Sequence, residues 1–97
     1  MLKSQLPTPS LVINRGVLEK NLKTMARFAQ HAGVKLRPHI KTHKNVTIAK
    51  LQVELGAIGV TCATVSEAEL MHAGGINDIF IAYPLLGDYQ LTKAAQL

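Results

Sequence analysis

Several residue types are scarce in this sequence of 97 residues. Tryptophan is absent, aromatic residues make up 4% of the chain, and Cys62 is the single cysteine. One cysteine excludes an internal disulfide and favours a reducing compartment, so we expect a cytoplasmic protein. No apolar run approaches the roughly 20 residues of a membrane span, and the amino terminus lacks the apolar core of a signal peptide. We therefore expect no membrane partner.

The charge balance is positive. Lysine and arginine together number 11 against 6 acidic residues, which gives a formal net charge of +5. This surplus permits an anionic partner such as nucleic acid or a phosphorylated ligand. The few aromatic residues and the absence of a recognised binding motif argue against nucleic acid. With 47% hydrophobic residues, the chain fits one globular unit or part of one.

Helical and extended patterns alternate along the chain. Polar capping side chains begin the expected helices, and glycines end three of them. The expected caps are Asn14, Asn45, Ser66 and Asp88, and Ser66 opens a Ser-x-x-Glu capping box with Glu69. The expected helices cover 14–33, 45–56, 66–74 and 88–97, and the expected strands cover 8–13, 34–41, 57–64 and 79–83.

This order of four β-α units predicts a parallel α/β sheet with right-handed crossovers. The strand centres Ile40, Val60 and Ile81 lie about 20 residues apart. Such regular spacing favours a (β/α)8 TIM-type barrel over an open doubly wound sheet. A complete barrel has eight units and typically ~250 residues. We therefore expect residues 1–97 to form an incomplete, amino-terminal part of a barrel domain.

The strand expected at 34–41 has two different faces. Its apolar positions are Val34, Leu36, Pro38 and Ile40, and the positions between them are Lys35, Arg37, His39 and Lys41. Because side chains alternate across a strand, one face is apolar and the other can carry several positive charges. Strands of a parallel sheet are normally apolar on both faces. The exception favours a functional site.

Lys41 is the leading candidate residue because it ends the polar face of this strand. In parallel α/β folds, ligands bind at the carboxyl ends of the strands. A partly buried lysine among other cations loses its proton more readily, which suits a Schiff-base nucleophile. The alternative is an ordinary solvated edge strand with a basic face, and the pattern alone leaves both open.

The other candidates are weaker. His39 and His43 have a His-x-x-x-His spacing, but in an extended chain they would lie ~13 Å apart, too far to share a metal ion. We therefore expect no metal site, and roles near the substrate suit both histidines better. Tyr83 follows the strand at 79–83 and either faces the same site as Lys41 or packs. Cys62 falls in an apolar strand and is expected to be a buried structural thiol.

Two stretches resemble a known family. Residues 37–44 read Arg-Pro-His-Ile-Lys-Thr-His-Lys, and Thr8-Pro9-Ser10-Leu11-Val12-Ile13 precedes them. Together with 59–69 and 73–79, they resemble the D-threonine aldolase and D-serine dehydratase family. Its members depend on pyridoxal 5′-phosphate (PLP) and have an alanine racemase-like amino-terminal barrel, known as fold type III.

The resemblance implies roles for single residues. Lys41 would form the internal aldimine with PLP, while Arg37 and His39 would orient the cofactor and the substrate carboxylate. His43 would lie in the loop above the site. The family also uses a divalent metal, Mn or Zn, whose ligands lie in a carboxyl-terminal β domain outside this chain. Full-length members of the family are expected to be homodimers.

The implied function is that of a PLP-dependent lyase acting on D-3-hydroxy amino acids. A D-threonine aldolase-like reaction, giving glycine and an aldehyde, is the first choice. Alternatives are a D-serine dehydratase, giving pyruvate and ammonia, and a non-catalytic PLP-binding protein. The lysine motif of the non-catalytic family lacks the Arg-Pro-His lead of residues 37–39, which counts against it. We expect the 97-residue chain alone to be inactive.

Overall fold

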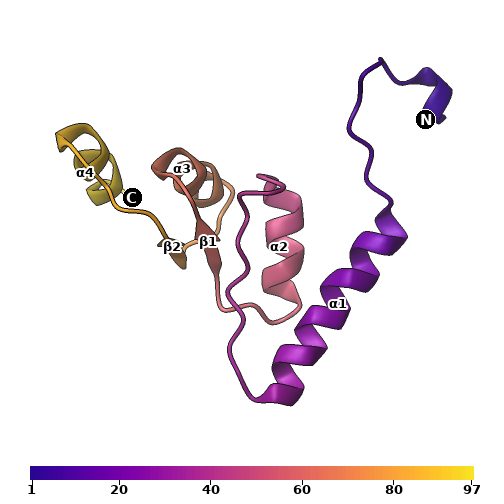
Figure 1. Cartoon of the computed structure of the whole chain (residues 1–97), viewed down its shortest axis with the longest axis horizontal. Coiled ribbons are helices and arrows are strands. Elements are labelled where there is room, and N and C mark those ends of the chain that lie inside the picture. Colours follow the sequence, from indigo (N-terminus) through magenta and orange to yellow (C-terminus); the bar gives the residue numbers. More distant parts are fainter.

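The computed structural model describes all 97 residues and shows an α/β arrangement (Figure 1). The molecule is flat, with principal extents of 46 × 41 × 20 Å. None of its helices combines the length and the apolar character that crossing a membrane requires. In chain order the elements are η1 (Lys3–Gln5), α1 (Arg15–Ala32), α2 (Val46–Glu54), β1 (Val60–Cys62), α3 (Val65–Ala73), β2 (Ile79–Ile81) and α4 (Asp88–Ala95).

The ends of the first two helices follow the predicted signals. The Asn14 side chain accepts a hydrogen bond from the Val17 amide at the start of α1, and Asn45 accepts one from Ile48 at the start of α2. Each bond satisfies a backbone donor that the helix itself leaves free. Gly33 ends α1 with φ at 68°, a left-handed conformation that glycine adopts without steric cost. Both predicted caps are confirmed.

The sheet is parallel, as predicted. Val60 to Cys62 of β1 pair with Ile79 to Ile81 of β2, and His39 forms an isolated parallel bridge with Thr61. The Ile58 amide donates to the Leu36 carbonyl at 2.9 Å, and the Thr61 amide donates to the Pro38 carbonyl at 2.8 Å. Between these two bonds the first segment advances by two residues, from 36 to 38, whereas the second advances by three, from 58 to 61. The extra residue makes a bulge at the amino end of β1.

The hydrophobic core lies between the sheet and the helices α2 and α3. Its seven buried members are Ile40, Ala49, Val60, Cys62, Ala68, Met71 and Ile76. The opposite face of the sheet carries His39, Thr61 and Phe80, which occupy one row across the paired strands. Phe80 is 57% exposed, because no helix of this chain covers that side of β2. The sheet therefore has one packed face and one open face.

Two expected strands differ from the structure. The segment 8–13 forms no strand, and Leu11, Val12 and Ile13 are exposed. Figure 1 shows this segment leading away from the sheet, where no neighbouring backbone is available to pair with it. The strand expected at 34–41 forms only the bridge at His39, because the bulge interrupts regular pairing below it.

Two expected helix caps were also wrong. Thr64, not Ser66, caps α3, and its side chain accepts from the Glu67 amide at 3.1 Å. The cap of α4 is Gly87 with φ at 85°, and Asp88 is the first helical residue. The observed cap precedes the expected one by two residues at α3 and by one residue at α4.

Candidate functional site

The candidate site is built on a tight turn at the carboxyl end of the sheet. Lys41 directly follows Ile40, which is fully buried in the core. The Ile40 carbonyl accepts hydrogen bonds from the amides of His43 at 3.2 Å and Lys44 at 2.8 Å. These bonds close a turn over 40–44 and place Lys41 just beyond the last paired residue of its segment. We call residues 40–44 the lysine turn.

Lys41 is exposed, and its amine forms no ion pair or hydrogen bond within the chain. Its backbone amide donates to His39 Nδ1 at 3.3 Å, so the two residues are in direct contact. The partial burial that the sequence led us to expect for Lys41 is not found, because no other segment of this chain covers the turn. The amine is thus unpaired and open to solvent.

His43 is held by its own surroundings. Its Nδ1 accepts from the Asn45 amide at 3.0 Å, so Nε2 carries the proton and donates to Gln52 Oε1 at 3.2 Å. These bonds tie the lysine turn to the first turn of α2 and to Gln52 near its end. No three histidine, cysteine, aspartate or glutamate side chains in the chain lie close enough to hold a metal ion.

Glu67 joins the lysine turn to α3. Its side chain is almost fully buried, and Oε2 accepts from the Ala63 amide at 2.6 Å. Oε1 lies 3.4 Å from Lys44 Nζ. Because Thr64 caps the same helix from the other side, Thr64 and Glu67 together satisfy two backbone donors at the start of α3.

The electrostatics follow from this burial. Burial of Glu67 acts to raise the pKa of its carboxyl, but the hydrogen bond from Ala63 and the contact with Lys44 outweigh it. The pKa of Glu67 is therefore lowered, and the group is an anion at neutral pH. Burial, with a smaller contribution from the charge of Glu67, raises the pKa of the Cys62 thiol to about 11. Cys62 is thus a neutral, buried core residue, as expected.

Arg37 lies at the opposite end of the sheet from Lys41. Its Nη1 is 2.7 Å from Asp78 Oδ1 and donates to the Asp78 carbonyl at 3.2 Å, just before β2. The same nitrogen lies 3.5 Å from the Val60 carbonyl at the start of β1. Gly59 makes room for this guanidinium, because a Cβ there would lie 2.7 Å from Nη1 and would collide with the Asp78 carbonyl. The structure therefore does not bring Arg37 and Lys41 together.

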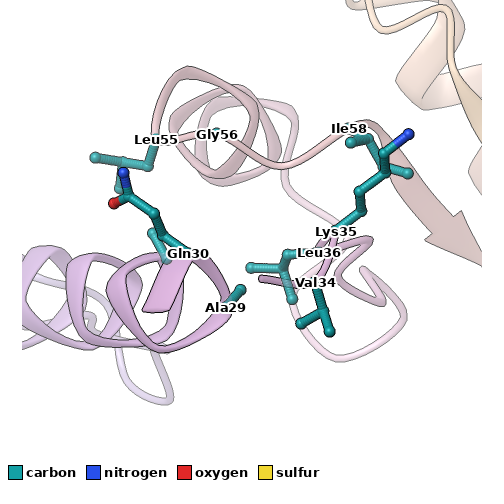
Figure 2. A pocket seen from close by; sticks show the side chains of 9 residues that line it. Ala29, Gln30, Val34, Lys35, Leu36, Leu55, Gly56 and Ile58 are labelled. Atoms are coloured by element: carbon teal, nitrogen blue, oxygen red, sulfur yellow. The ribbon is translucent and has the colours of Figure 1, made fainter. Parts of the chain in front are cut away.

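Tyr83 lies beyond the carboxyl end of β2 and is exposed. It lines a cavity of about 240 Å³ beside the start of α3, which Lys41 does not line. A second cavity, of about 350 Å³, lies at the amino end of the sheet between the ends of α1 and α2. Figure 2 shows the mostly apolar residues around this second cavity, none of which is a candidate for chemistry.

Sequence reasoning found the lysine turn but missed Glu67, Gln52 and Asp78. A signal for Glu67 was present, since Thr64 and Glu67 have the Thr-x-x-Glu spacing of a capping box. It overlapped the Ser66 and Glu69 pattern, and the sequence does not choose between them. Gln52 and Asp78 carry no local signal, because their partners lie 9 and 41 residues away along the chain.

Comparisons with known proteins agree with this arrangement. The profile of the family described as alanine racemase, N-terminal domain, matches residues 13–97. A D-threonine aldolase from an Arthrobacter species is 43% identical over 94 residues, covering 97% of this chain and 25% of the relative. D-threo-3-hydroxyaspartate dehydratase from Delftia sp. (strain HT23) is 39% identical over 92 residues, covering 95% and 24%. A D-serine dehydratase from Schizosaccharomyces pombe is 35% identical over 99 residues, covering 92% and 24%.

The chain therefore spans about a quarter of the length of these relatives. Among solved structures, D-threonine aldolase from Filomicrobium marinum superposes with a TM-score of 0.91 at 44% identity, covering 94% of this chain and 24% of that one. The predicted resemblance and the predicted barrel-type α/β fold are both confirmed. The similar proteins include aldolases and dehydratases.

Proposed function

Since this chain belongs to the alanine racemase N-terminal domain family, we propose that it forms part of a PLP-dependent lyase acting on D-3-hydroxy amino acids. The observation that carries the proposal is Lys41. Its unpaired amine stands on a closed turn at the carboxyl end of a parallel sheet, which is where α/β folds bind ligands. The named relatives act on substrates of this class.

The residues of the lysine turn fit PLP chemically. An unpaired primary amine is the group that bonds the aldehyde of PLP, and Lys41 offers one. When bound, PLP supplies an electron sink for negative charge at the substrate Cα. The chain's own contribution is to hold the amine of Lys41 in place and to deliver or accept a proton there.

The two histidines contact the lysine turn through their rings. His39 accepts a hydrogen bond from the Lys41 amide on Nδ1, which leaves Nε2 as its free ring nitrogen. His43 positions the end of the lysine turn through Gln52. A role for Arg37 or Tyr83 in binding the cofactor or substrate stays a prediction. The contacts of Arg37 with Asp78 support a bracing role at the far end of the sheet instead.

We favour D-threonine aldolase-like cleavage over dehydration, because the similarity to D-threonine aldolases is 43–44% and that to the named dehydratases is 35–39%. The alternative is a dehydratase, giving pyruvate and ammonia from D-serine. The divalent metal expected from the resemblance would take its ligands from outside this chain, because no three metal-binding side chains lie together here. We also expect a homodimer and no nucleic-acid partner.

The test is covalent trapping of PLP on the full natural polypeptide that carries residues 1–97. After borohydride reduction, mass spectrometry should locate the added mass on Lys41, and Lys41→Ala should lose it. Lys35→Ala is the matched control, because Lys35 lies at the amino end of the sheet, and it should keep the adduct. An adduct on other lysines alone, or salt-sensitive DNA binding without any adduct, contradicts the proposal.

Substrate tests then separate the two reactions. D-threonine should yield glycine and an aldehyde, whereas pyruvate release from D-serine would favour the dehydratase. Trapped PLP with neither product would favour a non-catalytic PLP-binding protein.

A further inference from the structure

Glu67 is the one charged side chain among the buried residues. A buried carboxylate is costly unless several groups compensate its charge, and here three do so. They are the Ala63 amide, the capped start of α3 and the Lys44 amine. The first two would serve helix capping alone. The contact with Lys44 reaches a different segment of the chain, three residues beyond Lys41.

Lys44 has an unusual backbone. It is the single non-glycine residue with positive φ, at 45°, a left-handed conformation that L side chains rarely adopt. Such a conformation persists where surrounding contacts determine it, and it often marks a functional site. The contacts here are the hydrogen bond of the Lys44 amide to Ile40 and the approach of Nζ to Glu67. One residue therefore closes the lysine turn at its backbone and fastens it at its side chain.

We propose that Glu67 is a positioning residue, which holds Lys44 and thereby sets the conformation of the turn that presents Lys41 to the cofactor. This inference rests on the proposed PLP site, but its evidence is separate. The geometry links α3 to the lysine turn through a single ion pair. Gln52 holds the other side of the same turn through His43. Lys41, which has no side-chain partner of its own, depends on these two supports.

Lys44→Met in the full natural polypeptide tests the idea. The Lys44 side chain is 61% exposed, so this change removes the ion pair with Glu67 and little packing. We expect the amides of His43 and Lys44 to exchange hydrogen at least about tenfold faster, measured without PLP. We expect PLP to become attached to Lys41 about tenfold more slowly, because displacement of a reacting group costs this much or more. Glu67→Gln should act in the same direction.

Two further variants separate positioning from simple structure. Lys44→Arg keeps the charge and should restore both rates most of the way. Lys50→Met removes an exposed lysine of α2 that has no ion pair, and it should change neither rate. If the pair had a merely structural role, Lys44→Met would not slow the attachment of PLP. Lys44→Arg would then have no lost rate to restore.

The outcomes are distinct. Folded Lys44→Met and Glu67→Gln proteins with unchanged amide exchange and unchanged attachment would overturn the positioning role, while the proposed function would stand. A wild-type protein that attaches no PLP to Lys41 would overturn the proposed function, and the positioning role with it. Faster exchange with slower attachment, reversed by Lys44→Arg, supports both.

Discussion

The two ends of the sheet are held by ion pairs of opposite design. At the carboxyl end, the anion Glu67 is buried with 6% of its side chain exposed, while its partner Lys44 is 61% exposed. At the amino end, the cation Arg37 is the more buried partner, with 25% of its side chain exposed against 60% for Asp78. Both pairs act on the same stretch of chain, residues 37–44.

We relate this difference in burial to different roles of the two ion pairs. The pair at the amino end fills the space beside Gly59 and holds the register of the bulge, which is a task of packing. The pair at the carboxyl end holds the lysine turn, which contains Lys44 with its positive φ and the unpaired amine of Lys41. Its task is to position that amine. In our proposal, one ion pair supports the fold and the other supports the site. The variants below are expected to break this contrast or to sharpen it, in order of decreasing effect.

The largest effect is expected from Gly59→Ala at the amino end. The new methyl group would meet the Asp78 carbonyl and the Arg37 guanidinium, so the bulge would have to open. We expect a loss of about 3 kcal/mol in the free energy of unfolding, typical of severe overpacking. Urea unfolding of the full natural polypeptide measures it. Gly16→Ala in the first turn of α1 is the control, because its Cβ would have only ordinary contacts, and it should not lower the free energy of unfolding. Equal stability of both variants would show that the close packing at Gly59 has no energetic weight.

Neutralising the two anions compares the two ends directly. Glu67→Gln loses a charged hydrogen bond in a buried place, so we expect a loss of about 2 kcal/mol in the free energy of unfolding. Asp78→Asn changes an exposed partner and should cost about 0.5 kcal/mol. Thermal and urea unfolding of both variants give the two values. A larger loss for Asp78→Asn would reverse the assignment of the two ends.

Acid should weaken the carboxyl end. The pKa of Glu67 is lowered in the folded protein from an ordinary value of 4.5. Its contribution to stability is therefore complete above pH 4.5 and is lost as the pH falls through the folded pKa. Unfolding curves between pH 7 and pH 3 should show a loss of stability that Glu67→Gln reduces. An identical pH profile for wild type and variant would show that folding does not change the pKa of Glu67.

A smaller effect than that of Glu67→Gln is expected at the helix cap beside Glu67. Thr64→Ala removes the acceptor for the Glu67 amide and should cost about 1 kcal/mol in the free energy of unfolding. Ser66 is the cap that the sequence pattern predicted, and Ser66→Ala should change the free energy of unfolding by no more than about 0.5 kcal/mol. Urea unfolding compares the two. A greater cost for Ser66→Ala would restore the cap expected from the sequence.

Local signals predicted much of this molecule. Asn14, Asn45 and Gly33 act where the sequence placed them, because a cap depends on a few neighbouring residues. The parallel order of β1 and β2 followed from the alternation of strands and helices. The segment 8–13 has the composition of a strand, yet it stays unpaired, because a strand exists only beside a neighbour.

The candidate site divides in the same way. The sequence by itself determined where Lys41 lies, since a motif and a strand end are both readable along the chain. Tertiary structure alone decided that Arg37 turns to Asp78 at the amino end and that Glu67 meets Lys44 at the carboxyl end. These pairs join residues 41 and 23 positions apart, which no local pattern encodes. Their partners are chosen when the strands come into register, and that choice separates the residue that supports the fold from the one that supports the site.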